Sequence, residues 1–382
     1  MIKLIIKNII RFFLHIFWIL PVKKSTVFFM SFSGDKCSCN PYYIFLQLNK
    51  QAPDLKYIWC CNSDKAKERL KGFDVQTVRY NSFSYIMALL TSNVLINNSG
   101  FPSWMPFRTK KQVVINTWHG GGAYKRVAIS EINTRAIRNR ERLTAKGTSY
   151  FVSSCRKFTE VMTNSVLVPE NKFLSTGMPR NDIFFNKALV TDTNKQVRKT
   201  LGLNDDDYVI LYAPTYRGSS LIHSTFDNQI DIAGIKRAAE KRYKKNVKLL
   251  FRGHVFFTAN NTQSFDMDVT SYPEMQELLC MADMLITDYS SSMWDFSFTN
   301  KPCLLFCPDI EDYIKNRGFY TDPDKWGFPV CKSNQEISEA IEQFNMDEYL
   351  KKIQENHEYF GSYENGSASQ SICNLIMEKV SK

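Results

Sequence analysis

Residues 284–296 read MLITDYSSSMWDF, and this stretch is the clearest indication of the fold class. Its first four residues are apolar or β-branched, which is typical of a short buried strand, and the hydroxyl-rich turn after them leads into a segment that begins like a helix. A strand that runs through a polar turn into a helix is the repeating unit of an open parallel sheet, whose ligands bind at the carboxyl ends of its strands. A helix start with free N–H groups also suits a phosphate, although Ser292 and Asp295 could instead form a simple capping pair.

Similar strand-like runs recur along the rest of the chain, at intervals that leave room for helices between them. They cover residues 26–32, 56–61, 75–80, 94–97, 113–117, 150–153 and 172–176 in the first half, and 208–213, 247–252, 284–287 and 303–306 in the second. Residues 186–207 between the two series are polar and hold almost no strand-like material, so the domain boundary is placed there. We therefore predict an α/β protein of two doubly wound, Rossmann-like domains that face a cleft, over residues 25–195 and 196–365.

The composition of the 382-residue chain excludes several classes of protein. Hydrophobic residues make up 44% and aromatic residues 14% of the chain, which is too apolar for a disordered protein. The ten cysteines are spread thinly, form no Cys-x-x-Cys pair and lie mostly inside apolar runs, so we expect a reduced protein without a structural zinc site. The net charge of +11 predicts attraction to an anionic partner, which could be nucleic acid, acidic lipid or a phosphorylated substrate.

The N-terminal residues 2–20, IKLIIKNIIRFFLHIFWIL, combine a long apolar run with regularly spaced cations. Basic side chains recur every four residues and therefore lie along one face of a helix: Lys3, Lys7, Arg11 and His15. This pattern predicts that residues 1–24 form an amphipathic helix at a membrane interface. A helix that covers the core of the first domain and a true membrane span are the alternatives. A secretory signal peptide is not expected, because no small-residue cleavage site follows the apolar run.

Three more polar motifs follow predicted strands. In NTWHGGG, residues 116–122, an imidazole that could act as a base near neutral pH precedes three glycines, whose backbone can approach a ligand closely. In YAPTYRG, residues 212–218, a strand ends in a hydroxyl and the guanidinium of Arg217, which matches phosphate oxygens. In FRGH, residues 251–254, a strand ends in a cation and an imidazole. Each motif alone could be a hydrogen-bonded turn or a surface ion pair, but their recurrence at strand ends indicates a functional site.

Together with TGMPRND (176–182) and KPCLLFCPDIEDYIKNRGFY (301–320), these motifs occur in an order that resembles the CDP-glycerol glycerophosphotransferase family of teichoic acid and capsule synthesis. The resemblance covers about residues 90–325. It implies a GT-B fold with an N-terminal acceptor domain, a C-terminal nucleotide domain and a C-terminal helix, residues 366–382 here, that crosses back to the first domain. Many members continue Trp-His-Gly with Thr-Pro-Leu-Lys, whereas this chain reads GGAYKR at residues 121–126, so the acceptor or the polyol could differ.

The resemblance also implies which residues form the site. His119 and His254 fall on the family's two functional histidines, and we assign His119 as the base that activates the acceptor hydroxyl. The donor's phosphates are assigned to His254 together with Thr215, Arg217, Arg252, Asp288, Ser290, Ser291 and Ser292. The acceptor loop is assigned to Gly120, Gly121, Gly122, Lys125 and Arg126. No metal or cofactor is expected, because the Asp-x-Asp triplets of the chain follow no obvious buried strand.

The resemblance thus predicts an enzyme that moves a polyol phosphate, with glycerol phosphate as first choice, from a CDP-polyol to a hydroxyl of an undecaprenyl-diphosphate-linked or polymeric glycan and releases CMP. Its expected place is the cytoplasmic face of the cell membrane, as a peripheral protein. Two alternatives stay open: a GT-B glycosyltransferase that uses a nucleotide sugar, and a non-catalytic basic protein that binds a membrane surface or nucleic acid. Nucleic acid is not expected as a partner, because the cations are scattered along the sequence rather than clustered among aromatic residues.

Overall fold

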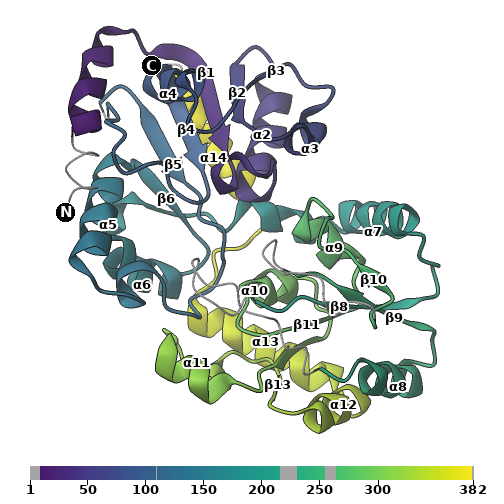
Figure 1. Cartoon of the computed structure of the whole chain (residues 1–382). Helices are drawn as coiled ribbons and strands as arrows, with labels where there is room; N and C mark the ends of the chain where they lie inside the picture. Colours follow the sequence, from purple (N-terminus) through teal and green to yellow (C-terminus); the bar gives the residue numbers. More distant parts are fainter. Residues whose placement is uncertain (1–8, 109, 216–229, 254–263, 381–382) are drawn as a thin grey trace. The chain divides into compact units, whose positions relative to one another are not determined.

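The computed structural model describes residues 9–108, 110–215, 230–253 and 264–380 of the chain. The chain divides into two compact units, and neither unit is a continuous piece of sequence (Figure 1). The first unit comprises Met1–Gly120, Val127–Asp182 and Ser362–Lys382, and the second unit comprises Gly121–Arg126 and Ile183–Gly361. The short segment directly after the Trp-His-Gly motif therefore belongs to the second unit, and the C-terminal segment belongs to the first.

The first unit is built on a seven-stranded parallel sheet with the strand order β3-β2-β1-β4-β5-β6-β7. Its strands are β1 (Lys23–Met30), β2 (Lys56–Cys60), β3 (Val75–Val78), β4 (Ser92–Asn97), β5 (Val113–Asn116), β6 (Tyr150–Ser153) and β7 (Phe173–Ser175). Strand β4 is buried along its whole length beside β1, with Leu95 opposite Phe28. The strand order reverses between β1 and β4, which is the switch point of a doubly wound sheet and the place where such sheets bind ligands.

The helices of this unit include α2 (Cys39–Gln51), α3 (Asp64–Lys67), α4 (Phe83–Thr91), α5 (Arg135–Gly147), α6 (Arg156–Val166) and α14 (Ala368–Val380). Helix α14 comes from the end of the chain and packs against α2. Its residues Ile372, Cys373 and Ile376 are buried, and the Cys373 thiol donates to the Ile44 carbonyl at 3.6 Å. The core of the first unit therefore includes side chains from both ends of the sequence.

The second unit has a six-stranded parallel sheet with the order β10-β9-β8-β11-β12-β13. Its strands are β8 (Tyr208–Tyr212), β9 (Val247–Phe251), β10 (Met267–Asp268), β11 (Met284–Thr287), β12 (Cys303–Phe306) and β13 (Val330–Cys331). Its helices are α7 (Lys187–Leu201), α8 (Ile232–Tyr243), α9 (Met275–Met281), α10 (Ser292–Ser297), α11 (Ile310–Asn316), α12 (Asn334–Glu342) and α13 (Met346–Phe360). The predicted α/β class with two parallel sheets is confirmed, while the cleft between domains stays a prediction.

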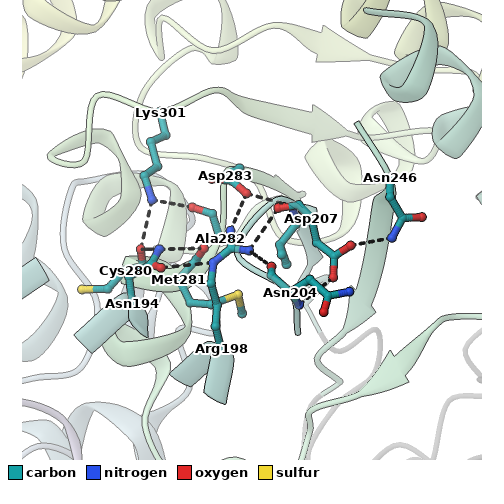
Figure 2. A network of polar contacts seen from close by, with 11 residues as sticks. Asn194, Arg198, Asn204, Asp207, Asn246, Cys280, Met281, Ala282, Asp283 and Lys301 are labelled. Carbon is teal, nitrogen blue, oxygen red and sulfur yellow. Dashed lines mark hydrogen bonds and ion pairs between the residues drawn. The ribbon is translucent and has the colours of Figure 1, made fainter. Parts of the chain in front are cut away.

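Figure 2 shows a network of polar contacts at the edge of the second sheet where its strands begin. We call it the strand-start network, and its side chains are those of Asn194, Arg198, Asp207, Asn246, Asp283 and Lys301. The guanidinium of Arg198, which is almost fully buried, donates to the carbonyls of Asn204 and Asp207 at 2.9 and 3.0 Å and to the Asp283 carboxylate at 2.8 Å. The Lys301 ammonium donates to two backbone carbonyls near the end of α9, and burial lowers the pKa of this lysine. The polar motifs lie at the opposite, carboxyl edge, so this network holds the fold rather than the site.

The predicted domain boundary at residues 195 and 196 falls inside α7. This helix is polar because most of its side chains face solvent, while Arg198 and Asn194 on its inner side bind the strand-start network. The amide of Asn194 donates to the Cys280 and Met281 carbonyls at 3.2 and 3.3 Å. The polar stretch between the two strand series is therefore a surface helix of the second unit.

The second unit also contains a partly buried imidazole. His357 of α13 lies flat against the ring of Phe298, with ring centroids 4.5 Å apart and an angle of 12° between the planes. The hydroxyl of Ser297 is 2.7 Å from Nε2 of the same histidine. Burial lowers the pKa of His357 to about 4, so the ring is neutral in the folded protein at neutral pH.

This histidine predicts a pH-dependent loss of stability. The unfolded chain takes up a proton on His357 near pH 6.5, whereas the folded protein resists protonation until about pH 4. Stability contributed by the neutral ring is therefore lost as the pH falls through this window. We expect the free energy of unfolding to drop by about 2 kcal/mol more in the wild type than in His357→Gln between pH 7 and pH 5. Urea unfolding of both proteins at the two pH values measures this, and parallel pH dependences would contradict it.

The N-terminal segment packs on the first unit. Residues 9–14 are helical and continue into a short 3-10 helix, η1 (His15–Ile19), and the Leu14 side chain joins the hydrophobic core with Phe28 and Leu95. In the parts of the chain that the structure describes, no helix is both long enough and apolar enough to span a bilayer. Lys3 and Lys7 of the predicted basic stripe lie outside the described residues.

Candidate active site

The Trp-His-Gly motif forms a tight turn at the carboxyl end of β5. Trp118 has a φ of 52°, in the left-handed region that residues other than glycine rarely adopt. Two hydrogen bonds support this conformation: the Trp118 N–H donates to the side-chain oxygen of Asn116 at 2.9 Å, and the Thr117 N–H donates to the Asn97 carbonyl at 2.7 Å. The turn presents His119 as an exposed side chain at the edge of the sheet.

The imidazole of His119 is fixed in one orientation. Its Nδ1 lies 2.7 Å from the backbone carbonyl of Asn98, directly after β4. The ring stacks on that of Trp118, with ring centroids 5.0 Å apart, and packs edge to face with the ring of Phe32, with centroids 5.8 Å apart. Because a carbonyl oxygen can only accept, Nδ1 carries the proton, and the lone pair of the neutral ring is on Nε2. This is the tautomer that the predicted role of His119 as a base acting through Nε2 requires.

Two residues that hold His119 were not assigned to the site from the sequence. Asn98 is fully buried, and its side-chain oxygen accepts the Phe32 N–H at 2.9 Å. Arg180 is 7% exposed and donates to the His119 carbonyl at 2.8 Å. The signals were present, because two consecutive asparagines, Asn97 and Asn98, stand at the end of the β4 strand run, and Arg180 belongs to the TGMPRND motif. Neither pattern shows that the Asn98 carbonyl or the Arg180 guanidinium binds His119, because these partners are far apart in the sequence.

The predicted acceptor loop is divided between the units, with Gly120 in the first and residues 121–126 in the second. Residues 123–126 are tied to the RGFY segment, 317–320. The Tyr124 carbonyl accepts the Tyr320 N–H at 2.7 Å, and the Arg126 N–H donates to the Gly318 carbonyl at 3.2 Å. Lys125 forms an isolated antiparallel bridge with Phe319.

The glycines of this loop have packing reasons of their own. A Cβ atom at Gly121 would collide with the ring of Trp294, and one at Gly122 would collide with Tyr124. Gly122 also has a φ of +67°, which strains any other residue. In the structure, these two glycines therefore allow close packing against Trp294 and Tyr124.

Thr215 and Asp288, both predicted to bind the donor, bind each other. The Thr215 N–H donates to both carboxylate oxygens of Asp288 at 2.9 Å, and its hydroxyl donates to one of them at 3.0 Å. Asp288 is 1% exposed. This contact joins the YAPT strand end of β8 to the TDYS strand end of β11, so the two motifs meet at the carboxyl edge of the second sheet.

The hydroxyls of residues 290–292 form the turn before α10. The Ser292 hydroxyl donates to the Ser290 hydroxyl oxygen at 2.9 Å, and the Ser292 N–H donates to the same atom at 3.3 Å. Ser291 occupies the N-cap position without a side-chain cap bond. Asp295 instead accepts from the Gln276 amide at 3.1 Å. Asp295 therefore has a role in packing α9 against α10.

Arg252 is engaged within its own unit. One guanidinium nitrogen donates to the Val269 and Tyr272 carbonyls at 3.3 and 3.0 Å, and burial lowers the pKa of this arginine. Its role in binding the donor stays a prediction. Arg217 and His254 lie outside the described residues. Among the residues that the structure describes, His, Cys, Asp and Glu side chains form no group of three or more that could hold a metal ion.

Sequence comparison identifies the family that the motifs indicate. The sequence model of the family described as CDP-glycerol:poly(glycerophosphate) glycerophosphotransferase matches residues 12–378. The teichoic acid poly(glycerol phosphate) polymerase of Bacillus subtilis (strain 168) is 30% identical over 380 residues, which cover 94% of this chain and 49% of that protein. The teichoic acid glycerol-phosphate transferase of Staphylococcus aureus (strain NCTC 8325 / PS 47) is 28% identical over 397 residues, which cover 99% of this chain and 100% of that protein.

Structural comparison gives the same result. A variant of the wall teichoic acid polymerase TagF soaked with CDPG is 28% identical, with a TM-score of 0.84 over 100% of this chain and 96% of that chain. The chain spans about half the length of the B. subtilis polymerase and the full length of the S. aureus transferase. The resemblance drawn from the motifs is confirmed: this chain belongs to the CDP-glycerol:poly(glycerophosphate) glycerophosphotransferase family.

Proposed function

We propose that this chain transfers a polyol phosphate, with glycerol phosphate as first choice, from a CDP-polyol to an acceptor hydroxyl and releases CMP. The observation that carries the proposal is the state of His119, an exposed imidazole whose Nδ1 donates to the Asn98 carbonyl. In this tautomer the lone pair of the ring is on Nε2, the atom that takes the proton of the attacking hydroxyl in this proposal. The family and the teichoic acid relatives supply the substrate class.

In this proposal the second unit holds the donor. The acceptor oxygen forms a bond to the distal phosphorus of the CDP-polyol while the bond from that phosphorus to the CMP oxygen breaks, so negative charge develops on the departing CMP. Fixed cations and hydroxyls must stabilise this charge, a role that we assign to Arg217, His254 and the hydroxyls of residues 290–292. The Thr215–Asp288 contact supports this role, because it holds the chain at Thr215, two positions before Arg217 in the sequence, beside the strand end that leads into the hydroxyl turn.

Product analysis tests the proposed reaction. The protein is incubated with CDP-glycerol, CDP-ribitol or nucleotide sugars, each with an undecaprenyl-diphosphate-linked disaccharide or a polymeric glycan as acceptor. We expect release of CMP and a mass gain of one or more polyol phosphates on the acceptor. A hexose mass gain from a nucleotide sugar would overturn the proposal in favour of a glycosyltransferase, and binding without any turnover would favour a non-catalytic protein.

We also propose a peripheral location at the cytoplasmic face of the membrane, where an undecaprenyl-linked acceptor would be available. The N-terminal segment supports this location, since its exposed side chains are apolar: Ile9, Ile10, Phe12, Phe13, Ile16, Trp18 and Ile19. Arg11 was predicted to belong to an exposed basic stripe, but it faces the protein. Its guanidinium donates to the Ser103 and Met105 carbonyls at 3.1 and 3.3 Å. The segment is thus anchored to the first unit by polar contacts and directs its apolar side chains outward.

Helix α5 adds a cationic surface to the same unit. Four exposed basic side chains fall on one face of the helix, at Arg135, Arg138, Arg142 and Lys146. The segment 100–107 lies between α5 and the N-terminal segment. It lines a cavity together with residues of α5, and its backbone carbonyls accept hydrogen bonds from the side chains of Arg11 and Trp18. Apolar side chains next to cations are the combination that binds anionic lipid surfaces.

The exposed apolar residues predict a membrane-binding defect. The triple variant Phe12→Ser, Phe13→Ser and Ile16→Ser should lose at least tenfold in binding to phosphatidylglycerol vesicles, since each large apolar side chain contributes about 1.5 kcal/mol or more when buried. A matched control replaces three exposed apolar residues of the second unit: Leu189→Ser, Ile314→Ser and Met346→Ser. Vesicle sedimentation measures both variants. Equal binding by the two triple variants would refute the assignment of the lipid-binding surface.

A further inference from the structure

Two buried side chains from distant parts of the first unit bind the backbone of the His119 turn. Asn40, in the first turn of α2, donates from its amide nitrogen to the Thr117 and Trp118 carbonyls, at 3.0 Å each. Arg180 donates to the next carbonyl, that of His119, at 2.8 Å. These two side chains therefore bind three consecutive backbone carbonyls, those of residues 117–119.

The two side chains also act on each other. The backbone N–H of Arg180 donates to the Asn40 side-chain oxygen at 3.1 Å, so the amide of Asn40 is bound at both ends. The Arg180 guanidinium also donates to the Cys39 thiol at 3.3 Å. Asn40 is 0% exposed and Arg180 is 7% exposed. Burying a guanidinium is costly unless its donors are bound, and a bond from a charged donor to a carbonyl is stronger than a neutral one.

The turn needs such support for two reasons. Trp118 is held in the left-handed backbone region, which costs about 1 kcal/mol or more and persists only where the surroundings enforce it. The chain then passes to the second unit after Gly120, so the His119 carbonyl lies one residue before that passage. A displaced carbonyl at this point would move the imidazole away from the Asn98 carbonyl that sets its tautomer.

We propose that Arg180, together with Asn40, is a positioning residue for His119. It holds the turn so that Nδ1 stays on the Asn98 carbonyl and the lone pair stays on Nε2. The inference rests on the proposed function for the role of Nε2 as base, but the tautomer itself can be measured without any substrate. It assigns a function to the Arg180 position of the TGMPRND motif, whose guanidinium donates to the His119 carbonyl.

The experiment compares Arg180→Met, Arg180→Lys and Asn40→Ala with the wild type in three measurements. Calorimetry gives the affinity for CDP-glycerol, single-turnover transfer gives the rate, and nitrogen NMR of protein with labelled histidine gives the tautomer of each ring. The chain has five histidines, and His119→Gln identifies the signal of His119. We expect the rate to fall by about 10-fold to 100-fold in Arg180→Met. Donor affinity should stay unchanged, and the His119 signal should show a mixture of tautomers.

The conservative and distant variants separate positioning from general damage. Arg180→Lys retains a cationic donor and should recover part of the rate, whereas Asn40→Ala should resemble Arg180→Met. The matched control is Arg69→Met, because Arg69 is an arginine of the same unit that donates to the Cys37 carbonyl at 3.4 Å and lies 4.0 Å over the Tyr42 ring. This control should keep the rate and the tautomer of the wild type.

The outcomes are distinct. An unchanged rate and an unchanged His119 signal in Arg180→Met would overturn the positioning role. A loss of rate accompanied by lost donor affinity and an unchanged tautomer would also overturn it, in favour of a general structural role. If Arg180→Met does not fold, Arg180→Lys and Asn40→Ala give the same test. A wild type that is inactive with every CDP-polyol, combined with tautomer mixtures in the variants, would refute the proposed reaction while supporting the positioning.

Discussion

His119→Gln lowers the rate of transfer from CDP-glycerol by roughly 100-fold or more, the scale of a lost general base. Glutamine keeps an N–H that can reach the Asn98 carbonyl, so the turn is expected to hold its shape while the basic lone pair on Nε2 is lost. Donor affinity should stay at the wild-type level, because the predicted donor residues belong to the second unit. Single-turnover transfer and donor titration measure the two effects separately.

His15 provides a matched control for this substitution. It is also an exposed histidine whose Nδ1 lies 2.7 Å from a backbone carbonyl, that of Arg11, but it belongs to the N-terminal segment. His15→Gln should transfer at the wild-type rate to a soluble acceptor. A His119→Gln enzyme as active as His15→Gln would exclude His119 as the base.

Arg198→Met should destabilise the second unit by about 3 to 5 kcal/mol. Arg198 is 5% exposed, and its removal leaves the Asn204 and Asp207 carbonyls without this donor and the Asp283 carboxylate without its cation. Methionine fills a similar volume, so the loss reports mainly on the polar contacts. Urea unfolding followed by a probe in the second unit measures the change in the free energy of unfolding.

The control for this prediction is the same substitution at an exposed arginine of the second unit. The Arg237 side chain is 72% exposed and lies 4.0 Å from the Asp231 carboxylate. Arg237→Met should change the free energy of unfolding by less than about 1 kcal/mol, the usual range for an exposed ion pair. A loss as small in Arg198→Met as the one expected for Arg237→Met would show that the strand-start network adds little to stability.

The strands and their polar ends could be predicted because a strand of a doubly wound sheet is buried on both faces. Strands β8, β11 and β12 accordingly consist almost entirely of apolar residues, and β4 has an apolar centre at residues 94–96. The polar motifs YAPTYRG and TDYSSS lie at the carboxyl ends of β8 and β11, where ligands bind in such sheets. The turn that carries His119 follows β5 in the same way. Local sequence is enough for these features, because the strand and its motif are neighbours in the chain.

The contacts that complete the site could not be predicted in the same way. Arg180 reaches a carbonyl 61 residues away, and Asn40 reaches carbonyls 77 and 78 residues away. Nothing in GGAYKR shows that residues 121–126 pack in the second unit, because the fit depends on Trp294 and on residues 317–320. Likewise, the arginine of FRGH resembles a phosphate ligand in sequence, while the structure shows Arg252 bound to the backbone at residues 269 and 272.

The packing of α14 against α2 has a consequence for folding during synthesis. All residues of the second unit, Gly121–Arg126 and Ile183–Gly361, leave the ribosome before α14 does. The second unit can therefore acquire its native contacts first, although the first unit begins earlier in the sequence. The first unit is complete only after α14 has been synthesised. Until then the surface of α2 that α14 covers stays exposed, including the Ile44 carbonyl that accepts from the Cys373 thiol in the folded protein. During that interval the nascent chain exposes apolar surface of the first unit, and chaperones bind chains in this state.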